Sequence, residues 1–289
     1  MVGIDWDRQM FVLVTPDAVV RHLASEVVRR LVGAGFAPVG WKVVWHRPAD
    51  LDAIHERNIT QVWKAYRYRL VDRLFGFGPA VALLVEDTEP EPDLSSHQRL
   101  RLVRGGSEPV NAAPGTIRGD LGSVNVMLAL MYSSDEPADS ERESAVLTGP
   151  AGFERGDPAD LARQLALLEL SRPAEWRGYE AVVAGVRART IAALWSELSP
   201  AARGVARALL DRGVPGLAEA EAGGQLADLL EPAGHLLAPL LRCAFEADSP
   251  GIDLDRARAV LRTYGTDLDP WEDLVLATSM RFASRRTGS

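Results

Sequence analysis

The residues best placed for chemistry in this sequence surround a short loop, Ala113–Asp120. The loop reads Ala-Pro-Gly-Thr-Ile-Arg-Gly-Asp, and residues 124–132 after it have the apolar character of a buried strand, followed by Ser133-Ser134-Asp135. A guanidinium offers a planar fork of hydrogen-bond donors, which suits phosphate oxygens. The loop is therefore a candidate phosphate site, although an arginine here could also be an ordinary surface residue paired with Asp or Glu.

Other kinds of site find less support in the residue types. Cys243 is the only cysteine, so no internal disulfide and no cysteine metal cluster can form. The five histidines are scattered without a paired ligand spacing, and we expect no zinc site.

The charge balance bears on the choice of partner. The net charge is −8, and residues 1–150 and 151–289 each contain 16 basic and 20 acidic residues. Because neither half is basic, we expect no nucleic acid as a main partner, while a local arginine pocket could still hold phosphate. No run of about 18 apolar residues could span a bilayer, and the N-terminus has no signal pattern, so we expect a cytoplasmic protein without a membrane partner.

Four apolar stretches in the first half read as buried strands, because they contain many β-branched residues and end at turn residues. Segments with helical spacing lie between them. This order predicts an α+β fold, a ferredoxin-like antiparallel four-stranded sheet with helices on one face. The expected strands are residues 9–15, 36–46, 80–85 and 124–132, and the expected helices are residues 19–31, 50–75 (a helical hairpin) and 94–104.

The second half reads as helical almost throughout. The turn-rich residues 149–157 predict a linker between a first domain, 1–148, and an all-α domain, 158–289. Leucine and tryptophan residues recur at helical spacing in the second domain and are most simply its core.

Residues 9–147 resemble one complete nucleoside diphosphate kinase domain. Four segments match that family in the right order and at near-family spacing: Phe11–Val19, Gly78–Ala82, the loop Ala113–Asp120, and Ser134-Asp135 with Ser140–Glu143. In such a kinase a histidine near the end of the fourth strand takes the γ-phosphate and passes it to a diphosphate. Arginines, a lysine and Mg²⁺ position the phosphates and stabilise their charge.

The resemblance implies roles for several residues. Arg101 and Arg118 fall at the positions of the phosphate-clamping arginines, and Ser107 keeps the hydroxyl of the family's threonine. Tyr68 falls at the aromatic position that stacks on the base, and it could equally be a core residue. Glu143 corresponds to the carboxylate that orients the catalytic histidine. The implied ligand is a nucleoside triphosphate, with Mg²⁺ as a possible companion and no metal bound by the protein alone.

The departures from the family pattern fall on the chemistry. The family's Asn-x-x-His-Gly-Ser-Asp reads here as Ala129 to Asp135, which places Tyr132 at the nucleophilic histidine. One extra residue blurs the register, and the ungapped alternative places Met131 there. Thr15 occupies the position of the phosphate-binding lysine, and Thr60 that of the tyrosine that guards the cleft. A phenol with a pKa near 10 is a poor substitute for imidazole, so we expect no phosphohistidine transfer.

Three functions remain open on the sequence alone. The first is a nucleotide-binding pseudoenzyme whose helical domain binds a protein partner or reports the nucleotide state. The second is a nucleoside triphosphate-dependent enzyme of another reaction type, with the second substrate on the helical domain. The third is a structural interaction module with an empty pocket. A homo-oligomer is compatible with each of them.

Overall fold

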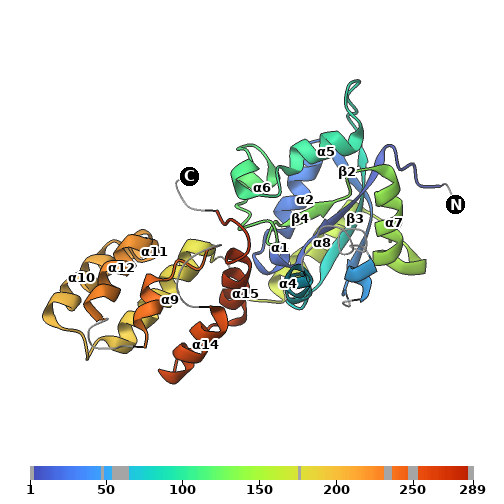
Figure 1. Cartoon of the computed structure of the whole chain (residues 1–289). Helices are drawn as coiled ribbons and strands as arrows, with labels where there is room; N and C mark the ends of the chain where they lie inside the picture. Colours follow the sequence, from blue (N-terminus) through green and yellow to red (C-terminus); the bar gives the residue numbers. More distant parts are fainter. Residues whose placement is uncertain are drawn as a thin grey trace. The chain divides into compact units, whose positions relative to one another are not determined.

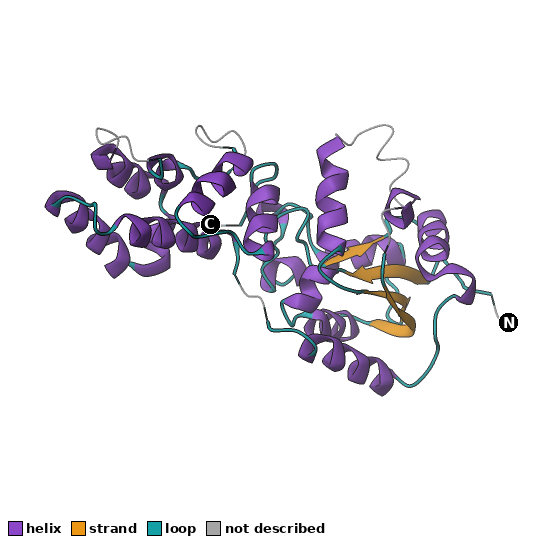
Figure 2. Cartoon of the chain, turned by 90° about the horizontal axis from the view of Figure 1, so that it is seen from below, coloured by secondary structure: helices purple, strands orange, loops and turns teal. Residues whose placement is uncertain are grey.

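The computed structural model describes residues 3–46, 49–53, 65–174, 177–230, 236–246 and 253–285. The chain separates into two units, Met1–Trp176 and Arg177–Ser289, which are taken here one at a time (Figure 1). All of the strands in the described part of the chain lie in the first unit (Figure 2).

A four-stranded antiparallel sheet forms the centre of the first unit. Its order is β2-β3-β1-β4, which confirms the predicted fold class. In the register, Val12 lies opposite both Leu83 and Ser133, and Leu13 lies opposite Tyr132. The strands are β1 (Gln9–Val14), β2 (Phe36–Val44), β3 (Ala80–Asp87) and β4 (Met131–Ser133).

Both faces of the sheet are buried, and the expectation of helices on one face alone was wrong. The even residues of β1, such as Val12, pack in one core with α1 (Pro16–Val20) and α2 (Ala24–Gly33). The odd residues Phe11 and Leu13 face the opposite side, where α4 (Ala65–Phe75) and α7 (Pro137–Thr148) contribute side chains. The near-continuous apolar run of β1 reflects this double burial.

The fourth strand is shorter than predicted. Residues 124–130 form turns, in which the Oδ1 atom of Asn125 accepts hydrogen bonds from the backbone of Met127 (3.0 Å) and Leu128 (3.1 Å). The segment is apolar because it is buried, and burial without regular pairing cannot be told from a strand by composition.

Three short elements connect the sheet to the loop Ala113–Asp120. Helix α5 (Ser96–Arg104) begins at a capping box, in which Ser95 and Gln98 bond each other's backbone. A 3-10 turn, Pro109–Asn111, and the single-turn helix α6 (Ile117–Asp120) follow.

The boundary between the units falls after the predicted linker 149–157. The backbone of Trp41 on β2 pairs with that of Glu154, and the 3-10 turn Gly149–Ala151 precedes this pairing. Helix α8 (Pro158–Leu170), expected in the helical domain, packs Leu161 and Leu165 into the core of the first unit. Its Glu169 also accepts hydrogen bonds from the backbone and hydroxyl of Ser25 (2.8 and 2.9 Å).

In the described part of the second unit every regular element is a helix, as predicted, and turns and irregular segments connect the helices. Several of its helices begin at a side chain that caps the first turn, for example Ser199 and Asp253. No described helix combines the length and apolar character needed to cross a bilayer. The helices are α9 (Tyr179–Leu194), α10 (Pro200–Asp211), α11 (Gly213–Ala218), α12 (Ala220–Leu230), α13 (Ala238–Arg242), α14 (Leu254–Thr263) and α15 (Pro270–Ser279).

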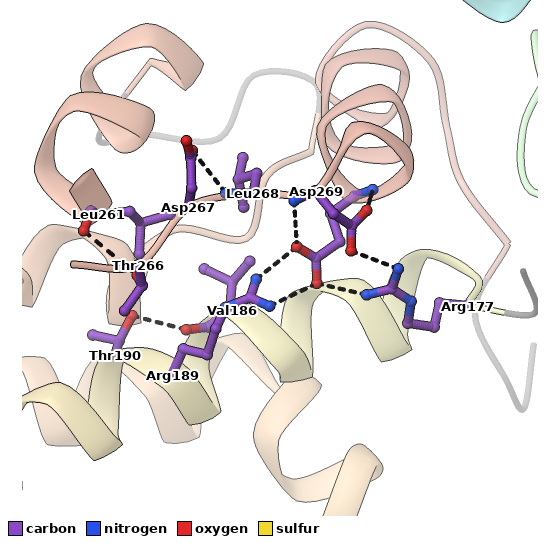
Figure 3. Close-up of polar contacts among 10 residues, drawn as sticks. Arg177, Val186, Arg189, Thr190, Leu261, Thr266, Asp267, Leu268 and Asp269 are labelled. Carbon is purple, nitrogen blue, oxygen red and sulfur yellow. Dashed lines mark hydrogen bonds and ion pairs between the residues drawn. The ribbon is translucent and has the colours of Figure 1, made fainter. Parts of the chain in front are cut away.

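Charged side chains, among them the buried Glu272 and Arg187, join α9 and the residue before it to α15 and to the segments near residues 218 and 243. Glu272 on α15 is 1% exposed and accepts hydrogen bonds from Arg177 (2.8 Å) and from both terminal nitrogens of Arg189 (2.9 and 2.8 Å). Arg177 also bonds Asp269, the N-cap of α15 (2.7 Å; Figure 3). Arg187, fully buried, donates to the carbonyl oxygens of Leu217, Glu219 and Cys243.

Replacing Glu272 by glutamine should weaken the packing of α15 on α9. The change keeps the shape of the side chain but leaves two arginines without their shared charge, and both are about one third exposed. We expect a loss of roughly 1–3 kcal/mol in local stability, less than for a fully buried pair. Native-state hydrogen exchange of the α9 and α15 amides measures it. Asp228→Asn, in the exposed pair with Arg242, is the control, and equal protection in both variants would contradict the expectation.

Candidate functional site

A cavity of about 280 Å³ lies on the face of the sheet formed by the odd residues of β1. Its apolar lining includes Phe11 and Leu13 from β1 and Val71 and Phe75 from α4. Its polar lining side chains, together called the polar end, are Thr15, Arg104, Ser107, Arg118, Tyr132 and Asp135. An apolar wall with a few convergent polar groups is the usual form of a small-molecule site.

The loop Ala113–Asp120 takes its shape from its own sequence. Gly115 has φ of +87°, a conformation that glycine adopts without strain. The Oγ1 atom of Thr116 accepts a hydrogen bond from the backbone of Gly119 (3.1 Å) and so caps α6. A Cβ atom at Gly119 would lie 2.1 Å from the carbonyl oxygen of Ala113, so only glycine fits. The turn thus directs Arg118 inward.

Arg118 is buried and bonds the backbone around the cavity. Its Nε donates to the carbonyl of Ala129 (3.2 Å), Nη1 to that of Gly105 (3.2 Å) and Nη2 to that of Met131 (2.7 Å). Burial, together with the neighbouring Arg104, lowers the pKa of Arg118 to about 9. The guanidinium therefore joins the end of α5 to residues 129–131 while it lines the cavity.

Tyr132 lies against Glu143. Its hydroxyl donates to Oε1 of Glu143 (2.9 Å), and Oε2 accepts from the hydroxyl of Ser134 (2.7 Å). This geometry supports the register that places Tyr132, and not Met131, beside the carboxylate. Burial and the adjacent Glu143 raise the pKa of Tyr132 above its ordinary value. Burial also raises the pKa of Glu143, although both hydroxyl donors oppose this effect. The phenol therefore stays protonated.

Thr15 is bonded to the turn that follows β1. Its Oγ1 donates to Oδ1 of Asp17 (2.6 Å), and Oδ2 of Asp17 accepts from the backbone of Leu130 (2.9 Å). Leu130 has φ of +68°, which is unusual for a residue with a side chain, and this hydrogen bond helps to hold it. Asp17 is completely buried, and burial raises its pKa. Asp17 therefore supports the turn through its side chain.

The other predicted site residues are distributed unevenly. Ser107 lines the cavity, whereas Arg101 is exposed on α5 and is not one of the cavity-lining residues in the described part of the chain. Tyr68 belongs to α4, but its side chain lies outside the described part, as does Thr60. The roles given to Arg101 and Tyr68 stay predictions.

Arg104 is the cavity residue that the sequence did not indicate. It ends α5, and its Nη1 donates to the carbonyl (2.8 Å) and the hydroxyl (2.7 Å) of Ser133. Nη2 lies 3.6 Å from Oδ1 of Asp135. The available signal was its position in the last helical turn, directly before Gly105-Gly106.

The first unit is similar in sequence to known proteins. The family model "Nucleoside diphosphate kinase" matches residues 8–151. The nucleoside diphosphate kinase of Archaeoglobus fulgidus is 36% identical over 138 residues, which are 47% of this chain and 83% of that protein. That of Thermobifida fusca is 33% identical over 136 residues, 47% of this chain and 93% of that protein. The structure of the Halobacterium salinarum enzyme in complex with CDP is 27% identical, with a TM-score of 0.43, over 54% of this chain and 98% of that one.

Replacing Arg118 by alanine should destabilise the first unit. Three buried carbonyl groups would lose a charged donor, and we expect a loss of about 2–4 kcal/mol in the free energy of unfolding. Scanning calorimetry of the full chain measures it. The control is Arg163→Ala on α8, whose side chain is 68% exposed. An unchanged transition in the Arg118 variant would show that the three carbonyls do not depend on the guanidinium.

Proposed function

This chain belongs to the nucleoside diphosphate kinase family through residues 8–151, and on that basis we propose that its first unit binds a nucleotide without transferring a phosphoryl group. The single observation that carries the proposal is the hydrogen bond from Tyr132 to Glu143 (2.9 Å).

The family reaction needs a nucleophile that attacks the γ-phosphorus and then releases the phosphoryl group. A neutral imidazole nitrogen does this because it has a free electron pair near neutral pH. The hydroxyl of Tyr132 donates a hydrogen bond to Glu143, and burial together with this carboxylate raises the pKa of the phenol. A protonated, hydrogen-bonded phenol is a poor nucleophile, and its phosphate ester would be a poor phosphoryl donor.

The described histidines offer no substitute in the cavity. His97 is 3% exposed, and its Nε2 lies 2.9 Å from the hydroxyl of Ser140, which also accepts a hydrogen bond from the backbone of Phe11. Burial lowers the pKa of His97. None of the described side chains that line the cavity is a histidine.

The shape and charge of the cavity support nucleotide binding. Arg104, Arg118 and Ser107 bring donors to one end, where phosphates would lie, and the apolar side suits a base. Mg²⁺, when bound, neutralises phosphate charge. Asp135 is the carboxylate that lines the cavity, and the described residues contain no cluster of three metal-ligating side chains. The ion would therefore be held mainly by the nucleotide, with Asp135 as a single protein contact. Partner binding by residues 177–289 stays a prediction.

The absence of transfer has a direct test. Incubation with γ-labelled ATP should leave no acid-labile phosphoprotein, and no label should pass to GDP. Tyr132→Phe is the matched control and should give the same background as wild type. Transfer by wild type that disappears in Tyr132→Phe would contradict the proposal and make Tyr132 a nucleophile. Activity that is equal in both and falls with further purification identifies a contaminating kinase.

Binding is tested separately by titration calorimetry with MgATP. We expect a Kd between about 1 μM and 1 mM, because one lost charge-assisted contact at Thr15 costs roughly 1.5–3 kcal/mol, or one to two decades of affinity. ATP and GTP should bind with similar affinity if stacking dominates base recognition. No heat at millimolar nucleotide would contradict nucleotide binding and favour the structural-module alternative.

A further inference from the structure

Arg104 is a buried cation whose positive charge is only partly balanced by the groups around it. Its two short hydrogen bonds go to Ser133, a neutral residue, and its Nε has no hydrogen-bond partner among the described residues. The nearest carboxylate, Asp135, lies 3.6 Å from Nη2 and is 65% exposed. A buried guanidinium is stabilised by well-aligned charged partners, and this one has a single distant partner.

The second arginine increases the positive charge at this end of the cavity. Arg118 lines the same end and donates to three carbonyl groups. Burial lowers the pKa of both arginines, and in each case the positive charge of a neighbouring arginine adds to this effect. An anion at the polar end would relieve this burial cost, and Nη2 of Arg104 could bond it in place of the exposed Asp135, which lies 3.6 Å away.

Two departures from the family pattern lie in the cavity that Arg104 lines or in contact with Arg104 itself. Ser133, which bonds Arg104 through its hydroxyl, stands where the family motif has glycine. Thr15, on the same end of the cavity, stands where the family has its phosphate-binding lysine. The charge missing at Thr15 is thus present at Arg104, anchored by a hydroxyl that a glycine could not supply.

We propose that Arg104 binds the phosphate groups of the nucleotide in place of the absent lysine, with Ser133 as its positioning residue. The inference rests on the proposed function, because it assigns a phosphate contact within the same cavity. It differs from that proposal in naming which residue supplies the charge.

Titration calorimetry with MgATP on the full chain tests the assignment. Arg104→Met keeps the apolar stem and removes the donors, and we expect binding about 10- to 100-fold weaker than wild type. Arg104→Lys keeps the charge and should recover part of the loss. Ser133→Ala keeps the arginine but removes its anchor and should show a smaller loss than Arg104→Met. Arg163→Met, an exposed arginine on α8, is the control and should bind as wild type does.

The outcomes separate the inference from the proposed function. If wild type and Arg104→Met bind MgATP equally well, the role of Arg104 is overturned and nucleotide binding stays intact. Wild type that does not bind overturns both. Should Arg104→Met fail to fold by near-ultraviolet circular dichroism, the other two variants decide: unchanged affinity in Arg104→Lys and Ser133→Ala together overturns the inference. Graded losses in the two support it.

Discussion

The burial of the Arg118 guanidinium is the constraint on which the site depends. Gly105 lies at the end of α5, whereas Ala129 and Met131 lie where residues 124–130 lead into β4, and one side chain bonds a carbonyl group of each residue. Because an unsatisfied buried carbonyl is costly, the end of α5, the irregular segment before β4, and β4 itself must keep their places around this group. Arg118 stands at a predicted phosphate-binding position and also holds this backbone, so a simple truncation would not separate a phosphate contact from its structural role.

Other polar side chains of the cavity also make structural hydrogen bonds, although they stand at positions that are catalytic in the family. Tyr132 and Ser134 satisfy Glu143, and Thr15 satisfies Asp17, which in turn holds the strained backbone of Leu130. These bonds hold in place the polar side chains that line the cavity. On this basis we propose that the cavity, with its arginines and its apolar wall, holds a nucleotide and does not react with it.

The sequence was sufficient where a pattern decides the structure by itself. Doubly buried strands such as β1 and β3 show as apolar runs, and the two motif residues Tyr132 and Glu143 lie in hydrogen-bond contact. The sequence was insufficient where a feature depends on contacts between residues that are far apart in the chain. The stripe of Leu161 and Leu165 shows that α8 is amphipathic but not which unit it packs on. Arg104 falls outside every motif position, and its role became visible only once Ser133 and the cavity were located. The direction of Arg118 toward carbonyl groups likewise depends on the turns of residues 124–130.

Phosphorus NMR of MgATP in the presence of the full chain reports nucleotide binding and phosphoryl transfer in one sample. We expect the triphosphate resonances to broaden and shift as protein is added. After GDP is added, we expect no GTP resonances to grow over hours at stoichiometric protein. GTP signals that grow at a rate proportional to the protein concentration, and that are lost with Tyr132→Phe, would contradict the second expectation. Triphosphate resonances that the protein leaves unchanged at millimolar concentrations would contradict the first.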